Sequence, residues 1–237
     1  MWAFDTEVSE IIQRTPSVKS FRLPIRAKNV RYRSGQFFFI TIKSNDKNLD
    51  HHFSFSSSPT EKGYIEFTKR ITSSEFSQTL DKMEPGAWAH LQGPEGEFTL
   101  PRKQTHLTFL SGGIGITPIR SMLRYIADKQ LNYNIVLLYG NGSPEEIVFR
   151  QELDSFHLAH KDLRIEHVLS GPNIPASWKG MTGFINKDLI AKAVPDYMQR
   201  LFYISGPPKM VLALEEQLIN LHVPENQIKK DSFTGYD

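Results

Sequence analysis

The chain has 237 residues, 39% hydrophobic and 23% charged, a composition typical of a globular protein that forms one large or two modest domains. Lys plus Arg number 28 and Asp plus Glu 26, and a net charge of +2 is too small to favour nucleic acid as a partner. The sequence contains no cysteine, which excludes disulfides, zinc–thiolate sites and Cys-ligated iron–sulfur clusters in this polypeptide, so a redox centre would be an organic cofactor or use other ligands.

The N-terminal stretch Met1–Glu7 has early acidic residues and lacks the charged-then-apolar pattern of a secretory signal. No apolar run approaches the length of a membrane span. We therefore expect a cytoplasmic protein with no membrane span, no metal site and no nucleic-acid partner.

The first hundred residues contain short segments rich in aromatic and β-branched residues, separated by turn residues. We expect six strands, at residues 4–12, 18–23, 37–42, 53–57, 64–68 and 88–91. Six short strands in this length predict a small antiparallel β-barrel. One helix interrupts them, because Ser73-Ser74 fits an N-cap followed by Phe76, Leu80 and Met83 on one face.

From His106 onward, buried strands alternate with helices. We expect strands at 107–110, 135–139, 163–169 and 201–204, and helices at 118–129, 144–156, 187–193 and 208–221. The second helix should begin at Pro144, because Ser143–Glu146 reads as a capping box with proline at the first helical position. This alternation predicts a parallel α/β sheet with ligand sites at the carboxyl ends of its strands. The polar connector 100–104 divides the chain into domains 1–101 and 102–237.

A glycine-rich turn follows the first of these strands, in Ser111-Gly112-Gly113-Ile114-Gly115-Ile116-Thr117-Pro118. Strand, glycine turn and helix together form a phosphate cradle, because glycines admit a pyrophosphate to the backbone amides of a helix N-terminus. The turn lacks the third glycine of the usual dinucleotide fingerprint and the Lys-Ser/Thr pair of a P-loop. Taken alone, it is also compatible with a tight turn that serves packing.

The turn is the third of four motifs in a fixed order: His51-His52-Phe53-Ser54, Gly93-Pro94-Glu95-Gly96-Glu97-Phe98, the glycine turn and Ser205-Gly206-Pro207-Pro208-Lys209. Across nearly the whole chain, this series resembles the ferredoxin-NADP reductase superfamily. The resemblance implies a six-stranded antiparallel barrel that binds FAD and a following α/β domain that binds NADH or NADPH. It implies hydride transfer from the nicotinamide to FAD, and then electron transfer to a separate acceptor such as a ferredoxin or an oxygenase component.

The family carries an Arg-x-Tyr-Ser motif in the barrel, in which Arg binds a flavin phosphate, Tyr packs on the ring and Ser reaches flavin N5. The matching positions here are His51, Phe53 and Ser54, and the resemblance makes Ser54 a catalytic residue. Lys69 and Arg70 could supply the fixed charge that His51 lacks. The alternative is a purely structural role, in which His51 lies on a strand edge and Phe53 belongs to the core.

Family members that bind FAD usually begin the barrel helix with Gly-Gly-x-x-Ser, whose amides hold the pyrophosphate. The matching segment here runs from Ser73 to Ser77, which assigns Ser74, Phe76 and Ser77 to the cofactor. Because both glycines are replaced, close backbone approach is restricted, and FMN remains an alternative to FAD. A plain N-cap is the other interpretation of this segment.

In the second domain, the resemblance assigns Ser205 a catalytic place near the nicotinamide, where the family usually has cysteine. The residues that it assigns to pyridine-nucleotide binding are Gly112, Gly113, Gly115, Thr117, Gly206 and Pro207. A terminal aromatic residue commonly covers the flavin in this family, which makes Phe233 or Tyr236 a candidate here. A terminal aromatic residue that only seals the sheet edge is the alternative.

The sequence indicates the preference for NADH or NADPH less directly than it indicates the other residues of the site. NADPH-using relatives often carry an arginine after the second strand to pair with the 2′-phosphate, whereas this chain has Gly142 near that place. This favours NADH, although Arg150 and Lys209 could compensate. Two other functional classes stay open: a reductase that uses free flavin as substrate, and a non-catalytic regulatory subunit that binds nucleotide.

Overall fold

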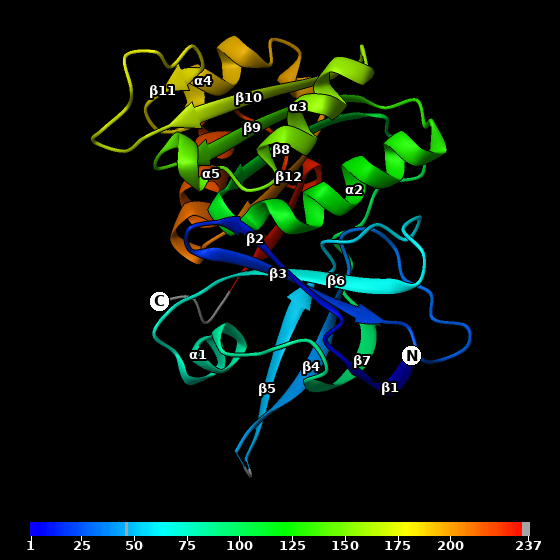
Figure 1. The fold of residues 1–237 in the computed structure, drawn as a ribbon. Helices are drawn as coiled ribbons and strands as arrows, with labels where there is room; N and C mark the ends of the chain where they lie inside the picture. Colours follow the sequence, from blue (N-terminus) through cyan, green and yellow to red (C-terminus); the bar gives the residue numbers. More distant parts are fainter. Residues whose placement is uncertain (46, 234–237) are drawn as a thin grey trace. The chain divides into compact units, whose positions relative to one another are not determined.

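The computed structural model describes residues 1–45 and 47–233 and divides into two compact units (Figure 1). The N-terminal unit comprises Met1–Leu100 together with Thr117–Asp128, and the C-terminal unit comprises Pro101–Ile116 and Lys129–Asp237. The first is built on antiparallel strands and the second on a parallel six-stranded sheet, which confirms the predicted fold class.

Two antiparallel sheets form the N-terminal unit, with strand orders β1-β7-β4-β5 and β2-β3-β6. Its elements are β1 (Trp2–Glu7), β2 (Glu10–Thr15), β3 (Val18–Pro24), β4 (Phe37–Ser44), β5 (Lys47–Ser54), β6 (Tyr64–Arg70), α1 (Glu75–Asp81) and β7 (Trp88–Glu95). The single strand predicted over residues 4–12 is two strands. The chain changes partners there, since Val8 donates its N–H to Ala87 beside β7 and Ser9 donates to Arg22 of β3.

The parallel sheet of the C-terminal unit has the order β11-β10-β9-β8-β12-β13. Its strands are β8 (His106–Gly112), β9 (Asn134–Asn141), β10 (Leu163–Leu169), β11 (Met181–Thr182), β12 (Leu201–Gly206) and β13 (Ile228–Ser232). The chain winds outward from β8 through β9, β10 and β11, and then returns to β12 on the other side of β8. The order therefore reverses between β8 and β12, the point at which open α/β sheets bind ligands.

Within the part of the chain that the structure describes, four α-helices and four short 3-10 turns lie between or beside these strands. The α-helices are α2 (Ile116–Lys129), α3 (Arg150–Ala159), α4 (Lys187–Ala193) and α5 (Pro208–Asn220), and the 3-10 turns are η1 (Gly113–Gly115), η2 (Pro144–Glu146), η3 (Tyr197–Gln199) and η4 (Glu225–Gln227). The predicted helix start at Pro144 is wrong, because only the 3-10 turn η2 forms there. Ile147, Val148 and Phe149 are buried, and Phe149 adopts a left-handed φ of 61°, so the α-helix begins only at Arg150.

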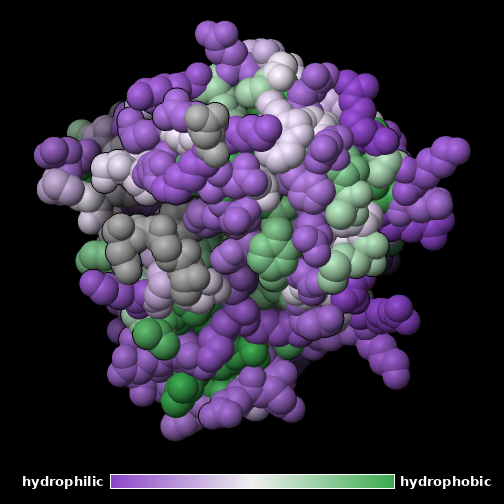
Figure 2. Space-filling model, turned by 90° about the horizontal axis from the view of Figure 1, so that it is seen from below, coloured by the Kyte–Doolittle hydropathy of each residue, from purple (hydrophilic) through white to green (hydrophobic). Residues whose placement is uncertain are grey.

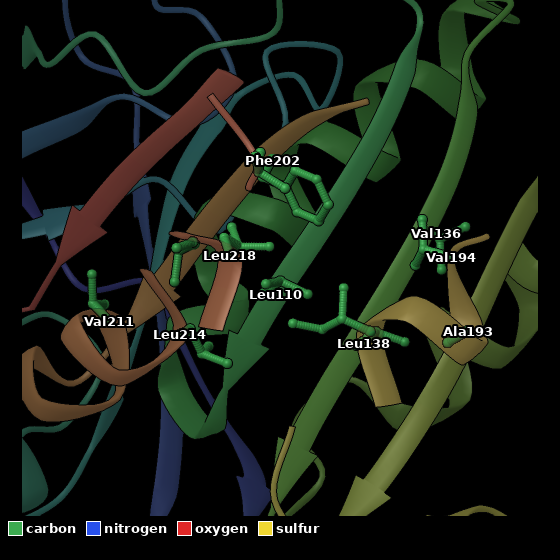
Figure 3. Close-up of a cluster of buried hydrophobic side chains, with 12 residues drawn as sticks. Leu110, Val136, Leu138, Ala193, Val194, Phe202, Val211, Leu214 and Leu218 are labelled. Atoms are coloured by element: carbon green, nitrogen blue, oxygen red, sulfur yellow. The ribbon is translucent and has the colours of Figure 1, made fainter. Parts of the chain in front are cut away.

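Apolar side chains fill one face of the parallel sheet beneath α4 and α5. Figure 3 shows Leu110, Leu138 and Phe202, from three strands, in one cluster with Leu214 and Leu218 of α5. Burial on both faces is typical of parallel strands. The molecular face shown in Figure 2 is mostly hydrophilic with small separate apolar patches, as expected for the outside of such a fold.

Candidate functional site

The glycine turn after β8 packs backbone to backbone against the turn after β12. A Cβ on Gly115 would collide with the Ser205 carbonyl and lie 2.6 Å from the Gly206 Cα, so only glycine fits at this position. Gly113 has a φ of +51°, and its carbonyl accepts a 2.8 Å hydrogen bond from the Tyr139 hydroxyl. These contacts fix the turn at the reversal point of the sheet.

Two buried hydroxyls lie at the carboxyl ends of β8 and β12. Ser111 and Ser205 are register neighbours, and both are fully buried. Within residues 1–45 and 47–233, neither hydroxyl has a hydrogen-bond partner, and the same holds for the buried side-chain amide of Asn141 at the end of β9. Unsatisfied buried polar groups are costly, so their gathering at one sheet edge fits a polar ligand such as a pyridine nucleotide.

The β12 turn carries two more of the residues assigned to the nucleotide, Gly206 and Pro207. Gly206 has a φ of +155°, a backbone conformation that favours glycine, and Pro207 precedes α5 as its N-cap residue. Phe233 donates its backbone N–H to the Gly206 carbonyl at 3.0 Å, which brings the half-buried Phe233 beside this turn. Tyr236 lies outside the described residues. Thr117 is buried at the start of α2.

In the N-terminal unit, the end of β5 carries a stack of rings. Phe53 is 4% exposed, and its ring stacks on His51 at 4.7 Å and on Phe67 at 4.6 Å between centroids. Phe76 of α1 lies 5.1 Å from His51 and 5.7 Å from Phe53. The structure therefore brings three of the residues assigned to flavin together, with Phe53 packed in the core of the stack.

Lys69 is the cation of this cluster. Its side chain is almost fully buried, and its ammonium lies 5.9 Å from the centroid of the Phe53 ring. Burial lowers the pKa of Lys69 to about 8, so the ammonium stays mainly charged at neutral pH. Burial and the nearby Lys69 charge outweigh a hydrogen bond with the His52 backbone and lower the pKa of His51, so its ring is mainly neutral at neutral pH. Arg70 instead donates to the Ser17 hydroxyl at 2.9 Å.

These side chains comprise an ammonium, aromatic rings and a hydroxyl. Ser54 is 9% exposed and lies opposite Phe37 in the β4–β5 ladder. Among the described residues its hydroxyl has no hydrogen-bond partner, so it can bond to a ligand. This donor set fits a flavin with its phosphate, because it matches both a ring system and a negative charge.

The Ser74 cap is confirmed, and its hydroxyl accepts a 3.3 Å hydrogen bond from the Ser77 N–H. Ser77 is fully buried, and its own hydroxyl lies 3.0 Å from that of Thr72. Phe76 is buried on the inner face of α1 together with Leu80. The segment is thus a capped helix start that the Thr72 and Ser74 hydroxyls tie to the preceding turn.

The segment directly after Ser54 is anchored by residues that sequence reasoning missed. Arg120 donates to the Ser56 carbonyl at 2.8 Å and pairs with Glu61 through two contacts of 2.5 and 3.2 Å. The Ser121 hydroxyl donates to the Ser57 carbonyl at 2.7 Å. Arg120 and Glu61 are 59 positions apart, so no local pattern in the sequence links them.

Comparisons with known proteins identify the family of each part of the chain. Residues 5–100 match the family described as oxidoreductase FAD-binding domain, and residues 109–216 match the oxidoreductase NAD-binding domain. NADH-cytochrome b5 reductase 1 of Meyerozyma guilliermondii is 30% identical over 210 residues, which cover 86% of this chain and 73% of that protein. The reductase component of glycine betaine monooxygenase from Pseudomonas aeruginosa is 25% identical over 213 residues, with 88% of this chain and 58% of the relative covered.

The fold agrees with a solved structure as well. The cytochrome b5 reductase domain of Ulva prolifera nitrate reductase matches with a TM-score of 0.85 and 20% identity, covering 97% of each chain. The chain belongs to the ferredoxin-NADP reductase superfamily of oxidoreductases that join an FAD-binding to an NAD-binding domain. It is an NAD(P)H-dependent flavoprotein reductase. None of the described helices combines the length and apolar character needed to cross a bilayer.

Proposed function

We propose that this chain passes electrons from NAD(P)H through bound FAD to a separate acceptor, such as a ferredoxin or an oxygenase component. The observation that carries this proposal is the reversal point between β8 and β12. There a glycine turn meets two buried hydroxyls that have no hydrogen-bond partner in the described part of the chain. When bound, FAD accepts a hydride and can release electrons one or two at a time. We propose residues 1–101 as the FAD domain and residues 102–237 as the nucleotide domain.

Each unit of the protein binds and orients one partner of the hydride transfer. Ser111 and Ser205 offer hydroxyls that can bond to the carboxamide of a nicotinamide, which would orient its ring. Ser54 offers a hydroxyl to flavin N5, and Lys69 offers its ammonium to a flavin phosphate. Protein groups thereby bind and align the two ring systems, and no side chain has to move a proton in the reductive half-reaction.

The cytoplasmic location expected from the sequence stays a prediction.

One observation favours a second candidate, a reductase that uses free flavin as a substrate. Phe53 stacks on both His51 and Phe67 and is 4% exposed, which leaves little of its ring for a flavin. The neutral His51 also supplies no charge to a phosphate. Both features would weaken flavin binding relative to a site with an arginine and an exposed tyrosine.

Spectroscopy of the purified protein separates these candidates. The main proposal predicts a yellow protein that releases FAD on heating and bleaches when NADH or NADPH is added without oxygen. Subsequent addition of a ferredoxin or ferricyanide should restore the oxidised spectrum. A colourless protein that oxidises NADH only when flavin is added would support the free-flavin candidate. Bound nucleotide without any flavin reduction would overturn both.

A further inference from the structure

Glu146, in the turn that follows β9, pairs with no other charged side chain among the described residues. The Glu146 side chain folds back over Gly142, so that a Cβ on Gly142 would lie 2.9 Å from one carboxylate oxygen and 3.6 Å from the other. Glu146 is half-buried, and across residues 1–45 and 47–233 its carboxylate has no hydrogen-bond or ion-pair partner. A half-buried carboxylate without a donor is available to a ligand that brings hydroxyl groups.

The topology places this carboxylate beside the nucleotide turn. Gly112, at the end of β8, is the register neighbour of Gly140 in β9, and Glu146 follows β9 by one short turn. A dinucleotide whose pyrophosphate lies at the β8 turn, with its nicotinamide toward Ser205 of β12, extends its adenosine half along the same sheet edge toward β9. The ribose of that half therefore approaches the loop that carries Glu146.

The neighbouring backbone keeps this loop in place. Ser170 donates its N–H to the Asn141 carbonyl at 3.0 Å, and Gly171 donates to the Gly142 carbonyl at 3.1 Å. A Cβ on Gly171 would collide with the same Gly142 carbonyl, so the two loops are in direct backbone contact. Glu146 itself is held by its N–H, which donates to the Ser143 carbonyl at 3.2 Å.

The two basic residues named as possible 2′-phosphate partners differ in how they are held. The Arg150 guanidinium lies 5.5 Å over the Trp178 ring and 3.9 Å from a carboxylate oxygen of Asp154. Lys209 is exposed in the first turn of α5, after β12 on the other side of β8. The three heavy atoms nearest to a Cβ on Gly142 all belong to Glu146, so this carboxylate is the charged group closest to Gly142.

We propose that Glu146 determines the nucleotide preference of this reductase: its carboxylate accepts a hydrogen bond from the adenosine ribose of NADH and repels the 2′-phosphate of NADPH. This inference rests on the proposed function, because it assigns the nucleotide to the β8 turn. A carboxylate and a phosphate at contact distance repel each other strongly, whereas a ribose hydroxyl gains a charge-assisted hydrogen bond.

The test compares Glu146→Gln with Glu145→Gln, which removes the same charge from the adjacent exposed position. Wild-type holoenzyme should prefer NADH. We expect Glu146→Gln to raise kcat/KM for NADPH about tenfold and to lower that for NADH, and Glu145→Gln to shift the ratio less than about twofold. Retained turnover with NADH would show that the variant is folded. An unchanged ratio in Glu146→Gln, or a wild-type preference for NADPH, would overturn the inference.

Binding of nucleotide fragments gives a readout that does not depend on hydride transfer. We expect adenosine 2′,5′-bisphosphate to bind Glu146→Gln about tenfold more tightly than wild type, and 5′-AMP to bind it no more tightly. Equal responses to the two fragments would overturn the role of Glu146. If neither NADH nor NADPH reduces the flavin of wild type, the proposed function fails, and the fragment measurement still decides the site.

Discussion

The two units hold the segments that we propose to bind ligands by different means. In the N-terminal unit, the segment after Ser54 is fixed by side chains, above all by the buried pair between Arg120 and Glu61. In the C-terminal unit, the turn at Gly115 is fixed by direct contact between two backbones. Side-chain anchors tolerate substitution when partners change together, whereas backbone contact tolerates only glycine. Only glycine therefore fits at position 115.

The largest effect should come from breaking the side-chain anchor. Arg120→Met leaves the Glu61 carboxylate buried without its main partner, and such a loss typically costs about 3–5 kcal/mol. We expect this destabilisation in denaturant unfolding of the holoenzyme. Arg124→Met on the same helix removes a more exposed pair with Asp128 and should cost less than about 1 kcal/mol. Equal losses in the two variants would contradict the anchor.

The same anchor predicts a pH dependence with a defined sign. Burial alone would raise the pKa of Glu61, but the hydrogen bond and charge of Arg120 outweigh it and leave the pKa below the ordinary 4.5. The stability that Glu61 contributes is therefore present above pH 4.5 and is lost as the pH falls through the lower folded value. Arg120→Met should flatten this acid dependence, which urea titrations between about pH 3 and 6 would measure.

The backbone contact gives the next largest effect. Gly115→Ala places a methyl group against the Ser205 carbonyl and the Gly206 Cα, and overpacking of this kind costs up to about 3 kcal/mol. We expect NADH binding to be lost while FAD remains bound, measured by nucleotide titration and by the flavin spectrum. Gly140→Ala is the matched control at the end of β9, since its Cβ would meet no atom closer than 3.6 Å. Loss of FAD together with NADH would contradict the independence of the two sites.

A smaller effect is expected at the hydroxyl of Ser54. Ser54→Ala should slow flavin reduction by NADH more than it weakens FAD binding, because a hydrogen bond at flavin N5 matters most as charge develops there. Loss of one such donor should cost about 2 kcal/mol in the transition state. Stopped-flow reduction measures this, and a rate equal to wild type would remove Ser54 from the mechanism.

The smallest effect concerns the charge of Lys69. With a pKa of about 8, its ammonium should hold a flavin phosphate below that pH and release it as the pH rises further. We expect the Kd of FAD for the apo-protein to rise about tenfold above this value, and Lys69→Met to abolish the pH step. Lys19→Met, the neighbour on β3 whose partner is Asp81, should keep it. A pH step that survives in Lys69→Met would assign it to another group.

The sequence predicted the C-terminal unit better than the N-terminal one. Hydrophobic runs and punctuating glycines located four of the parallel strands and the turn at Gly115, because these signals are local. The short edge strands β11 and β13 carry no comparable run. The capping pattern at Ser143 predicted the helix start too early. Ile147 and Val148 are buried, and the helix begins only after Phe149, whose backbone is left-handed. The Arg120–Glu61 pair and the stack around Phe53 depend on contacts between distant segments, which periodicity cannot reveal.

Hydride transfer from NADH to bound FAD can be tested by anaerobic stopped-flow reduction of the holoenzyme with NADH deuterated at the transferred position. Because each site is proposed to bind one reactant, we expect stoichiometric bleaching of the flavin, one nucleotide per flavin, with a slower rate for the deuterated nucleotide. Bleaching at the same rate with both isotopes would place another step before hydride transfer. A flavin that stays oxidised with saturating NADH and NADPH would contradict hydride transfer between the two cofactors.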